Sequence, residues 1–245
     1  MGARDAARFR VLCAARANGK PLAYITGTVG FYGREFLVTE SVLVPRPETE
    51  HMVEAALTFL HERARFSSTA SRPQVFDVGT GSGAIACTLA AEDPEAVVDA
   101  TDASAAALVI AAENARRLGV AGRCRFTLAD IALPNVSATY EVIVANLPYV
   151  PTADVPGRPD PLSFEPRSAL DGGEDGLDAY RALLRLAPSR LIPGGLLLME
   201  AAPQTIGRLE DLTRAAFPRA AIEVRRDYAD LERYLFVKTA PSHAR

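Results

Sequence analysis

Three glycines alternate with small polar residues directly after a short apolar run, and this spacing suits a ligand-binding turn. The run is Val75-Phe76-Asp77-Val78, and the turn follows as Gly79-Thr80-Gly81-Ser82-Gly83. Glycine lets the backbone turn tightly and approach a ligand closely. The next apolar run ends in Asp102, where a carboxylate can accept hydrogen bonds from both hydroxyls of a ribose. The two segments therefore predict a site for a ligand that contains a nucleoside.

The spacing of the glycines favours one kind of nucleoside cofactor. Dinucleotide-binding turns have the pattern G-x-G-x-x-G, in which the helix that follows faces a pyrophosphate. This turn has the pattern G-x-G-x-G, counted from Gly79. S-adenosylmethionine carries no phosphate, and we expect it here, with a dinucleotide and a purely structural turn as alternatives. Asp130, after the third apolar run, could accept from an adenine amino group or could be a helix cap or loop residue.

The segment Asn146-Leu147-Pro148-Tyr149 follows another apolar run and carries the chemistry that we expect. An amide at the end of a buried strand costs about 1–3 kcal/mol unless it is hydrogen-bonded, although a turn-forming Asn is an alternative explanation. The Asn146 side-chain oxygen and the Leu147 carbonyl could accept both hydrogen bonds of a planar NH₂ group and direct its nitrogen at a methyl donor. Pro148 stiffens this backbone and Tyr149 offers a flat face. The segment therefore predicts N-methylation of an amide or amine.

The elements that must position these residues follow from the hydrophobic pattern. Apolar runs alternate with helical stretches from residue 74 onward, which predicts a mostly parallel sheet with helices on both faces. The last two strands are joined by a short loop and should pair antiparallel. Before this sheet we expect a helix at 4–18, a β-hairpin within 24–44, a helix at 48–65 and a polar linker at 67–73. The later strands are expected at 75–78, 97–101, 125–128, 142–145, 196–200, 220–224 and 233–238, with helices at 84–91, 105–118 and 177–191.

Composition excludes several classes of protein. Lys and Arg number 27 against 30 Asp and Glu, so the net charge of −3 disfavours a nucleic-acid partner. The three cysteines show no C-x-x-C spacing, and the histidines form no cluster with them, so we expect reduced thiols and no metal site. The N-terminus lacks the apolar run of a secretory signal, and no segment is apolar enough to span a membrane. These features predict a cytoplasmic protein.

From about residue 20 to 238 the chain resembles the peptide chain release factor N5-glutamine methyltransferases. The resemblance includes the glycine turn and the segment that begins at Asn146. It also extends over several stretches outside them. These are Pro21-Leu22-Ala23-Tyr24-Ile25-Thr26-Gly27, Val42-Leu43-Val44-Pro45-Arg46-Pro47-Glu48-Thr49-Glu50, Phe164-Glu165-Pro166-Arg167-Ser168-Ala169-Leu170 and Gly176-Leu177-Asp178-Ala179-Tyr180.

This resemblance implies methylation of the Gln in the Gly-Gly-Gln motif of bacterial release factors, with S-adenosylmethionine as the donor. It implies the α/β, Rossmann-like fold of class I methyltransferases, with seven strands of which the last is antiparallel. Cofactor contacts are implied at Gly79 to Gly83, Asp102, the pair Asp130-Ile131 and Asn146. Substrate contacts are implied at Asn146 to Tyr149, and we also expect Phe31 to contact the substrate.

The chain departs from the family pattern at three places. Leu147 stands where the family usually has Pro, but the backbone carbonyl is retained, so we expect activity to survive. Ala201-Ala202 replaces Ile-Gly after Glu200, which could alter a turn. Only about one helix precedes the hairpin, whereas the family has an N-terminal domain of several helices that helps to grip the release factor. We therefore expect a small N-terminal element at 1–45 and a methyltransferase domain at 46–245.

Two other functions are compatible with the same residues. A related enzyme could methylate a Gln of a ribosomal protein or an exocyclic amine of a nucleic acid, since the same tetrapeptide serves adenine amino groups in similar enzymes. A non-catalytic, cofactor-bound scaffold is the other alternative, although every residue that the chemistry needs is present.

Overall fold

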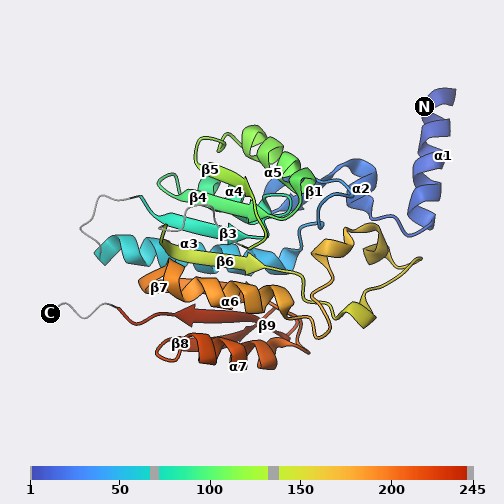
Figure 1. Cartoon of the computed structure of the whole chain (residues 1–245). Helices are drawn as coiled ribbons and strands as arrows, with labels where there is room; N and C mark the ends of the chain where they lie inside the picture. The colour runs from blue at the N-terminus through green and yellow to red at the C-terminus, as the bar shows by residue number, and fades with distance from the viewer. Residues whose placement is uncertain (1, 67–71, 132–137, 242–245) are drawn as a thin grey trace.

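Seven strands form one central sheet between two layers of helices in the computed structural model, which describes residues 2–66, 72–131 and 138–241 (Figure 1). The spatial order is β5-β4-β3-β6-β7-β9-β8, in which β9 runs in the direction opposite to that of the other six strands. The predicted class I methyltransferase topology is therefore confirmed. The strands are β3 (Gln74–Val78), β4 (Val97–Asp102), β5 (Cys124–Leu128), β6 (Tyr140–Asn146), β7 (Leu191–Glu200), β8 (Ala221–Arg226) and β9 (Glu232–Lys238).

Alternate residues of the strands point to opposite faces of the sheet and pack in two separate hydrophobic clusters. Along β6, Val142 and Val144 join a cluster with α3, α4 and α5, whereas Ile143 and Ala145 join a cluster with α6 and α7. Both faces of β6 are thus buried, which is why its sequence is continuously apolar rather than alternating. The helices are α3 (Glu50–Phe66), α4 (Ala84–Glu92), α5 (Ala105–Arg117), α6 (Asp178–Arg190) and α7 (Ile206–Ala216).

The order of the strands creates a binding crevice between β3 and β6. The chain moves outward from β3 to β4 and β5, and then returns to place β6 on the other side of β3. Ligands of open α/β sheets bind at such a reversal, outside the carboxyl ends of the strands. The glycine turn follows β3 and Asn146 ends β6, so both lie at this crevice.

The N-terminal segment contains the predicted hairpin, but the hairpin begins later than expected. Residues 22–26 form a short helix, α2 (Leu22–Thr26), despite the β-branched and aromatic residues that favoured a strand. Gly27 ends this helix in the left-handed conformation, with φ 85°, and its N–H donates to Ala23. The hairpin then consists of β1 (Thr28–Phe31) and β2 (Arg34–Leu37). The Asn114 side chain of α5 bonds both the N–H and the carbonyl of Leu37, which ties the hairpin to the main body.

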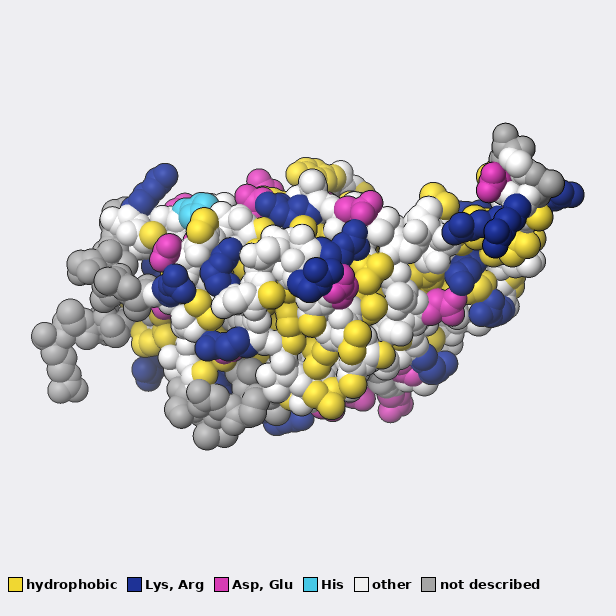
Figure 2. All heavy atoms as spheres, turned by 90° about the horizontal axis from the view of Figure 1, so that it is seen from above, with side chains coloured by type: hydrophobic (Ala, Val, Ile, Leu, Met, Phe, Trp, Pro, Cys, Tyr) yellow, Lys and Arg dark blue, Asp and Glu magenta, His cyan; other side chains and the backbone are white. Residues whose placement is uncertain are grey.

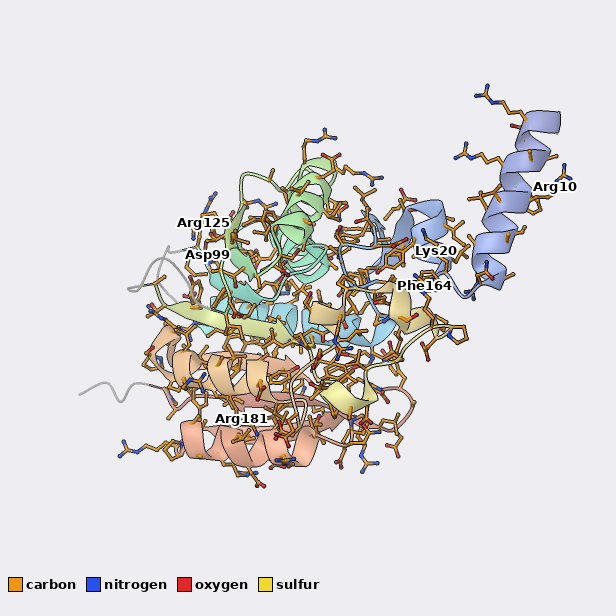
Figure 3. The ribbon with its side chains drawn as sticks, turned by 45° about the vertical axis from the view of Figure 1, so that its right-hand side comes forward. Arg10, Lys20, Asp99, Arg125, Phe164 and Arg181 are labelled. Carbon is orange, nitrogen blue, oxygen red and sulfur yellow. The ribbon has the colours of Figure 1, made fainter. Side chains whose placement is uncertain are left out.

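The first helix, α1 (Ala3–Ala17), projects away from the body, as Figures 1 and 3 show. Dark blue Lys and Arg side chains gather over this end of the molecule in Figure 2. Phe9 and Val11 of the helix are exposed. The division of the chain after residue 45 stays a prediction. Phe31 and Phe36 of the hairpin belong to the same core cluster as residues of α3 and α4.

Two further differences, in α7 and in β7, separate the expected elements from the observed ones. The helix α7 was not expected, although its buried residues Ile206, Leu209 and Thr213 have helical spacing. Strand β7 begins at Leu191, directly after α6, rather than at residue 196. Residues 67–71 of the expected linker at 67–73 lie outside the residues that the structure describes.

Candidate functional site

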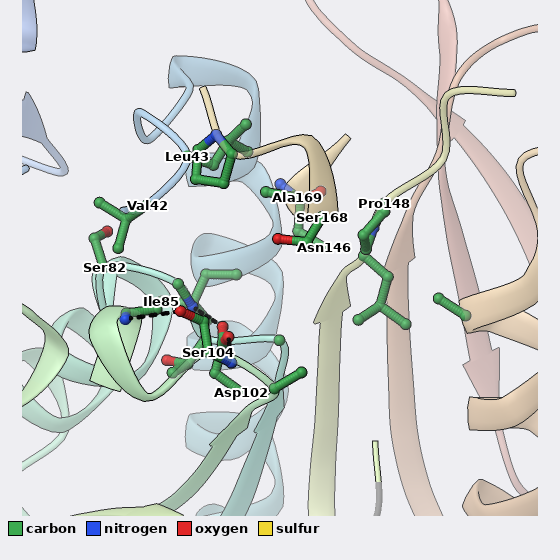
Figure 4. A pocket seen from close by; sticks show the side chains of 18 of the residues that line it. Val42, Leu43, Ser82, Ile85, Asp102, Ser104, Asn146, Pro148, Ser168 and Ala169 are labelled. Atoms are coloured by element: carbon green, nitrogen blue, oxygen red, sulfur yellow. Dashed lines mark hydrogen bonds between the residues drawn. The ribbon is translucent and has the colours of Figure 1, made fainter. Parts of the chain in front are cut away.

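A cavity of about 590 Å³ opens at the carboxyl ends of β3, β4 and β6. This volume is within the usual range for a site that holds a small molecule or cofactor. Figure 4 shows Ser82, Asp102 and Ser104 around one part of the cavity, with Asn146 and Pro148 on another side. Most of the residues expected from the sequence line it. They are Phe31, Gly79, Thr80, Gly81, Ser82, Asp102, Asp130, Ile131, Asn146, Leu147 and Pro148; Gly83 and Tyr149, both described, are outside the lining.

The glycine turn brings β3 into contact with the end of β6. Gly79, Gly81 and Gly83 all have left-handed backbones, with φ of 72°, 54° and 79°. A Cβ at Gly79 would lie 2.8 Å from Cδ2 of Leu147, so the leucine side chain would have to move, and the left-handed backbone at residue 79 itself favours glycine. The turn expected to hold a cofactor and the segment expected to hold an acceptor are thus adjacent.

Asp102 anchors the glycine turn and keeps capacity for a ligand. One carboxylate oxygen accepts from the Gly81 N–H and the other accepts from the Ser104 N–H, both at 2.8 Å. Each oxygen retains further lone pairs, so the carboxylate can also accept from hydroxyl groups in the cavity. This geometry fits the pair of ribose hydroxyls for which Asp102 was expected.

Asp77 lies fully buried beneath the turn. Its Oδ2 accepts from the Thr80 hydroxyl at 2.6 Å and from the Ala86 N–H at 3.1 Å. Its Oδ1 has no hydrogen-bond partner among the described residues. Burial raises the pKa of Asp77 to about 7, although both hydrogen bonds oppose the shift. The turn is therefore held from below by a carboxyl group that titrates near neutrality.

Two further expected contact regions line the cavity. Asp130 and Ile131 follow β5 in a loop, where Ile131 has a left-handed backbone with φ 57°. Phe31 lines the cavity although it is only 1% exposed, and its ring packs edge-on against Phe36.

Among the described residues, no group of His, Cys, Asp or Glu side chains is arranged to hold a metal ion.

The Asn146 amide is held by a buried chain of hydrogen bonds. Its nitrogen donates to the Thr49 hydroxyl at 3.0 Å, and that hydroxyl donates to Oε2 of Glu200 at 2.8 Å. Thr49 and Glu200 are 4% and 1% exposed. Burial raises the pKa of Glu200 to about 7, while the Thr49 hydrogen bond and Arg233 oppose the shift.

Tyr180 holds the backbone of Leu147 from the opposite side. Its buried hydroxyl contacts the Leu147 N–H at 3.3 Å, the Leu147 carbonyl at 3.2 Å and, closest of the three, the Glu200 carbonyl. A phenol has one proton, which goes to the closest acceptor, so the Tyr180 oxygen accepts from the Leu147 N–H. The Leu147 carbonyl thereby keeps its capacity to accept from another donor.

A glycine-rich loop supports the backbone of the next two residues. An added Cβ at Gly172 would lie 2.6 Å from the Pro148 carbonyl oxygen, and one at Gly176 would lie 2.4 Å from that of Tyr149. Burial and the negative charge of Glu200 raise the pKa of Tyr149 to about 12, so its hydroxyl stays protonated. The loop thus fixes the course of the segment that follows Asn146.

An ion pair closes the cavity on the side of the hairpin. Arg46 contacts Oε1 of Glu165 at 2.5 Å, and the Val44 N–H donates to the other oxygen at 3.2 Å. The Glu165 side chain is only 2% exposed, and the residues that follow it, Pro166, Ser168 and Ala169, line the cavity. The pair thereby joins the segment before α3 to the loop that covers the site.

The family comparison agrees with this geometry. A family model described as "Methyltransferase small domain" matches residues 54–156. The release factor glutamine methyltransferase of Moorella thermoacetica is 45% identical over 228 residues, which are 93% of this chain and 78% of that protein. The protein of the same name from Bordetella pertussis is 43% identical over 227 residues, 93% of this chain and 81% of its own.

The chain belongs to the release factor glutamine methyltransferase family.

A solved structure of a methyltransferase from Pyrococcus furiosus shows the same fold at 16% identity. Its TM-score is 0.58, and the match covers 98% of this chain and 100% of that one. Three of the four stretches quoted for the resemblance, 42–50, 164–170 and 176–180, contribute residues to the cavity lining, and the Tyr24 hydroxyl of the fourth donates to the carbonyl of Val42, which also lines it.

Several residues of this family member were not expected to matter for the site. Thr49 was quoted only as part of a motif, Glu200 only as the residue before a departure, and Tyr180 only as the end of a motif. A buried carboxylate at a strand end is a recognisable signal for Glu200, because it must have a polar partner. Nothing in the sequence identifies Thr49 as that partner, since the two are 151 positions apart.

Proposed function

We propose that this chain transfers a methyl group from S-adenosylmethionine to the side-chain amide nitrogen of the Gln in the Gly-Gly-Gln motif of bacterial release factors. Membership of the release factor glutamine methyltransferase family supports the acceptor. The single observation that carries the chemistry is the hydrogen bond from the Asn146 side-chain nitrogen to Thr49. It leaves the Asn146 side-chain oxygen available to accept a hydrogen bond from the NH₂ group that is to be methylated.

The cavity fits S-adenosylmethionine by the character of its donors and acceptors. The Asp102 carboxylate can accept from ribose hydroxyls, and the open backbone at Gly81 leaves room for the methionine part, since no atom lies within 4 Å of an added Cβ. Asp130 and Ile131 would contact the adenine. When bound, the cofactor supplies an electrophilic methyl group.

Asn146 and Leu147 would orient the acceptor. The nitrogen of a carboxamide is a weak nucleophile, because its lone pair is delocalised into the carbonyl. The Asn146 Oδ1 and the Leu147 carbonyl would accept its two N–H groups and hold the nitrogen over the glycine turn. Both hydrogen bonds strengthen as positive charge builds on the nitrogen, so they favour the transition state over the ground state. Water can take the extra proton afterwards, because an N-protonated amide is a strong acid.

The side chains around the acceptor contribute positioning rather than general base catalysis. Tyr149 stays protonated at neutral pH because its pKa is about 12. Effective molarities from good positioning are large enough to account for much of the rate. Contact of Tyr149 and Phe31 with the substrate stays a prediction, because Tyr149 lies outside the cavity lining and the Phe31 side chain is 1% exposed.

One experiment distinguishes the release factor Gln from the other candidate methyl acceptors, a Gln of a ribosomal protein and an exocyclic amine of a nucleic acid. A planar exocyclic amine could occupy the same two acceptors, but the net charge of −3 disfavours nucleic acid. Purified protein and isotope-labelled cofactor are incubated with a release factor, a ribosomal protein fraction and total RNA in parallel. Label in the release factor alone supports the proposal, whereas label in RNA or ribosomal protein contradicts it, and cofactor binding without any transfer supports the scaffold alternative.

The proposed activity places the protein in the cytoplasm, where release factors act. In the part of the chain that the structure describes, no helix is long and apolar enough to cross a membrane. We further propose that residues 1–45 act as a small element beside the methyltransferase domain at 46–245.

A further inference from the structure

The two ends of an Asn side-chain amide have nearly the same shape but opposite hydrogen-bonding character. The oxygen only accepts and the NH₂ group only donates. The NH₂ group that is to be methylated can donate a hydrogen bond to the side-chain oxygen of Asn146, whereas the side-chain nitrogen of Asn146 would repel it. The activity of the site therefore depends on which end of the amide faces the cavity.

The surroundings of Thr49 decide this orientation. An ionised Glu200 offers only acceptors, so the Thr49 hydroxyl must donate its single proton to the carboxylate, at 2.8 Å. The same hydroxyl oxygen can then only accept from Asn146. The nitrogen of Asn146 fits that position at 3.0 Å, whereas its oxygen would place two acceptors against each other.

We propose that Thr49 and Glu200 are positioning residues that lock the Asn146 amide with its oxygen toward the acceptor nitrogen. This inference rests on the proposed function and names the residues that prepare its central group. The ordered chain runs from Glu200 on β7, through Thr49 at the start of α3, to Asn146 at the end of β6 (the segment Pro47–Thr49 is a 3₁₀ turn).

The three residues are held in place by the fold rather than by a flexible loop. Asn146 and Glu200 are paired neighbours in the β6–β7 register. The Tyr234 hydroxyl of β9 donates to the carbonyl of Glu48, directly before Thr49, at 2.7 Å. Thr49 itself is 4% exposed, so water does not compete freely for its hydroxyl. These contacts preorganise the amide before any acceptor arrives.

Three substitutions test the proposal. Thr49→Val removes the hydroxyl and keeps the branched shape, whereas Thr49→Ser keeps the hydroxyl. Thr88→Val is the matched control, because Thr88 is also fully buried but its hydroxyl has no hydrogen-bond partner in the described part of the chain. We expect Thr49→Val to lower kcat for release factor methylation by about 10²-fold, the order of effect of misplacing a catalytic group.

The pattern of the other measurements separates positioning from a general loss of structure. In Thr49→Val, Kd for S-adenosylmethionine should stay close to that of Thr88→Val, and KM for the release factor should change far less than kcat. The Tm of Thr49→Val should be lower than that of Thr88→Val, because the buried Glu200 carboxylate loses its hydrogen-bond donor, but the variant should remain folded at the assay temperature. Thr49→Ser should recover most of the lost rate. A rate for Thr49→Val within threefold of that for Thr88→Val would overturn the proposal, as would equal losses in the Ser and Val variants.

A second readout does not depend on activity. In protein labelled with ¹⁵N at Asn, the Asn146 NH₂ signal is assigned by its absence in Asn146→Asp. Its protons should exchange slowly with solvent in the wild type and in Thr49→Ser, and faster in Thr49→Val. Unchanged exchange in Thr49→Val would refute the lock even if the wild type proved inactive on release factors. Conversely, a wild type with slow exchange but no release factor methylation would retain the lock and reject the proposed function.

Discussion

The side-chain nitrogen of Asn146 lies 3.0 Å from the hydroxyl oxygen of Thr49, although the two residues are 97 positions apart in the chain. This contact joins the end of β6 to the start of α3. Because the nitrogen of the Asn146 amide is bound to Thr49, its oxygen is the end that faces the cavity and can accept a hydrogen bond.

Replacing Asn146 should separate catalysis from cofactor binding. Asn146→Ala removes the side-chain acceptor, and we expect kcat to fall at least about 10²-fold, the usual cost of removing one group that stabilises transition-state charge. The Kd for S-adenosylmethionine, measured by titration calorimetry, should stay within about tenfold, because the Asp102 contacts remain. A large loss of cofactor affinity with little loss of kcat would contradict this assignment.

The rate should depend on pH through Glu200, whose pKa burial raises to about 7. A protonated Glu200 can donate to Thr49, and the Thr49 proton is then free to be donated to Asn146. Either end of the Asn146 amide can therefore face Thr49, and its preferred orientation is lost. The kcat should therefore rise with pH toward a plateau above about 7 and fall as pH drops below it. The Glu200→Gln variant cannot ionise, and it should lose this dependence.

The charged groups around Glu200 are part of this expectation. Arg233 on β9 and Arg46 before α3 lower the pKa of Glu200, whereas Glu48 raises it. Asp77 also has a pKa raised to about 7, so the profile is measured at saturating cofactor in both proteins. An unchanged profile in Glu200→Gln would assign the ionisation to another group.

Asp102 should control cofactor affinity with little effect on turnover. Its carboxylate both anchors Gly81 and is expected to bind the ribose, so Asp102→Ala removes charge-assisted hydrogen bonds worth about 3 kcal/mol. The Kd for S-adenosylmethionine should rise roughly 10²-fold, whereas kcat at saturating cofactor should change much less. An affinity within threefold of the wild type would show that the carboxylate does not contact the cofactor.

Gly172 should be sensitive to a single methyl group. An added Cβ would lie 2.6 Å from the Pro148 carbonyl oxygen, a distance at which the backbone must shift. We expect Gly172→Ala to lose about 1–3 kcal/mol of stability and much of its activity. Gly207→Ala is the matched control, because Gly207 is in α7 with no atom within 4 Å of the added Cβ. Thermal unfolding of both variants checks this, and equal Tm values would contradict it.

Leu147→Pro introduces the residue that the family usually has at this position. The carbonyl is retained, so turnover should stay within about tenfold of the wild type. The variant loses the N–H that donates to Tyr180 at 3.3 Å, and we expect a stability loss of about 1 kcal/mol. A loss of turnover greater than about 10²-fold would mean that the Leu147 side chain or its N–H contributes to catalysis in addition to supporting the backbone.

The sequence predicted the parts of the site that depend on local pattern. The glycine turn, Asp102 and Asn146 each follow a buried strand, and parallel strands bring their carboxyl ends to one edge of a sheet. The contact between Thr49 and Glu200 joins segments far apart in the chain, and no local pattern predicts such a pair. The helix at Leu22–Thr26 differs from expectation because Gly27 ends a helical turn there and the partly buried Ala23 and Tyr24 pack against the cluster of Val38 and Val42, which outweighs the strand preference of its residues.

The central claim is that the oxygen acceptors at Asn146 and Leu147 hold a glutamine side-chain amide for methylation. Peptide mapping by mass spectrometry tests it most directly, on a release factor incubated with this protein and S-adenosylmethionine. We expect one added methyl group on the side-chain nitrogen of the Gln in the Gly-Gly-Gln motif, formed at least about 10²-fold more slowly with Asn146→Ala. A methyl group at any other residue, or equal methylation by the wild type and Asn146→Ala, would contradict the account.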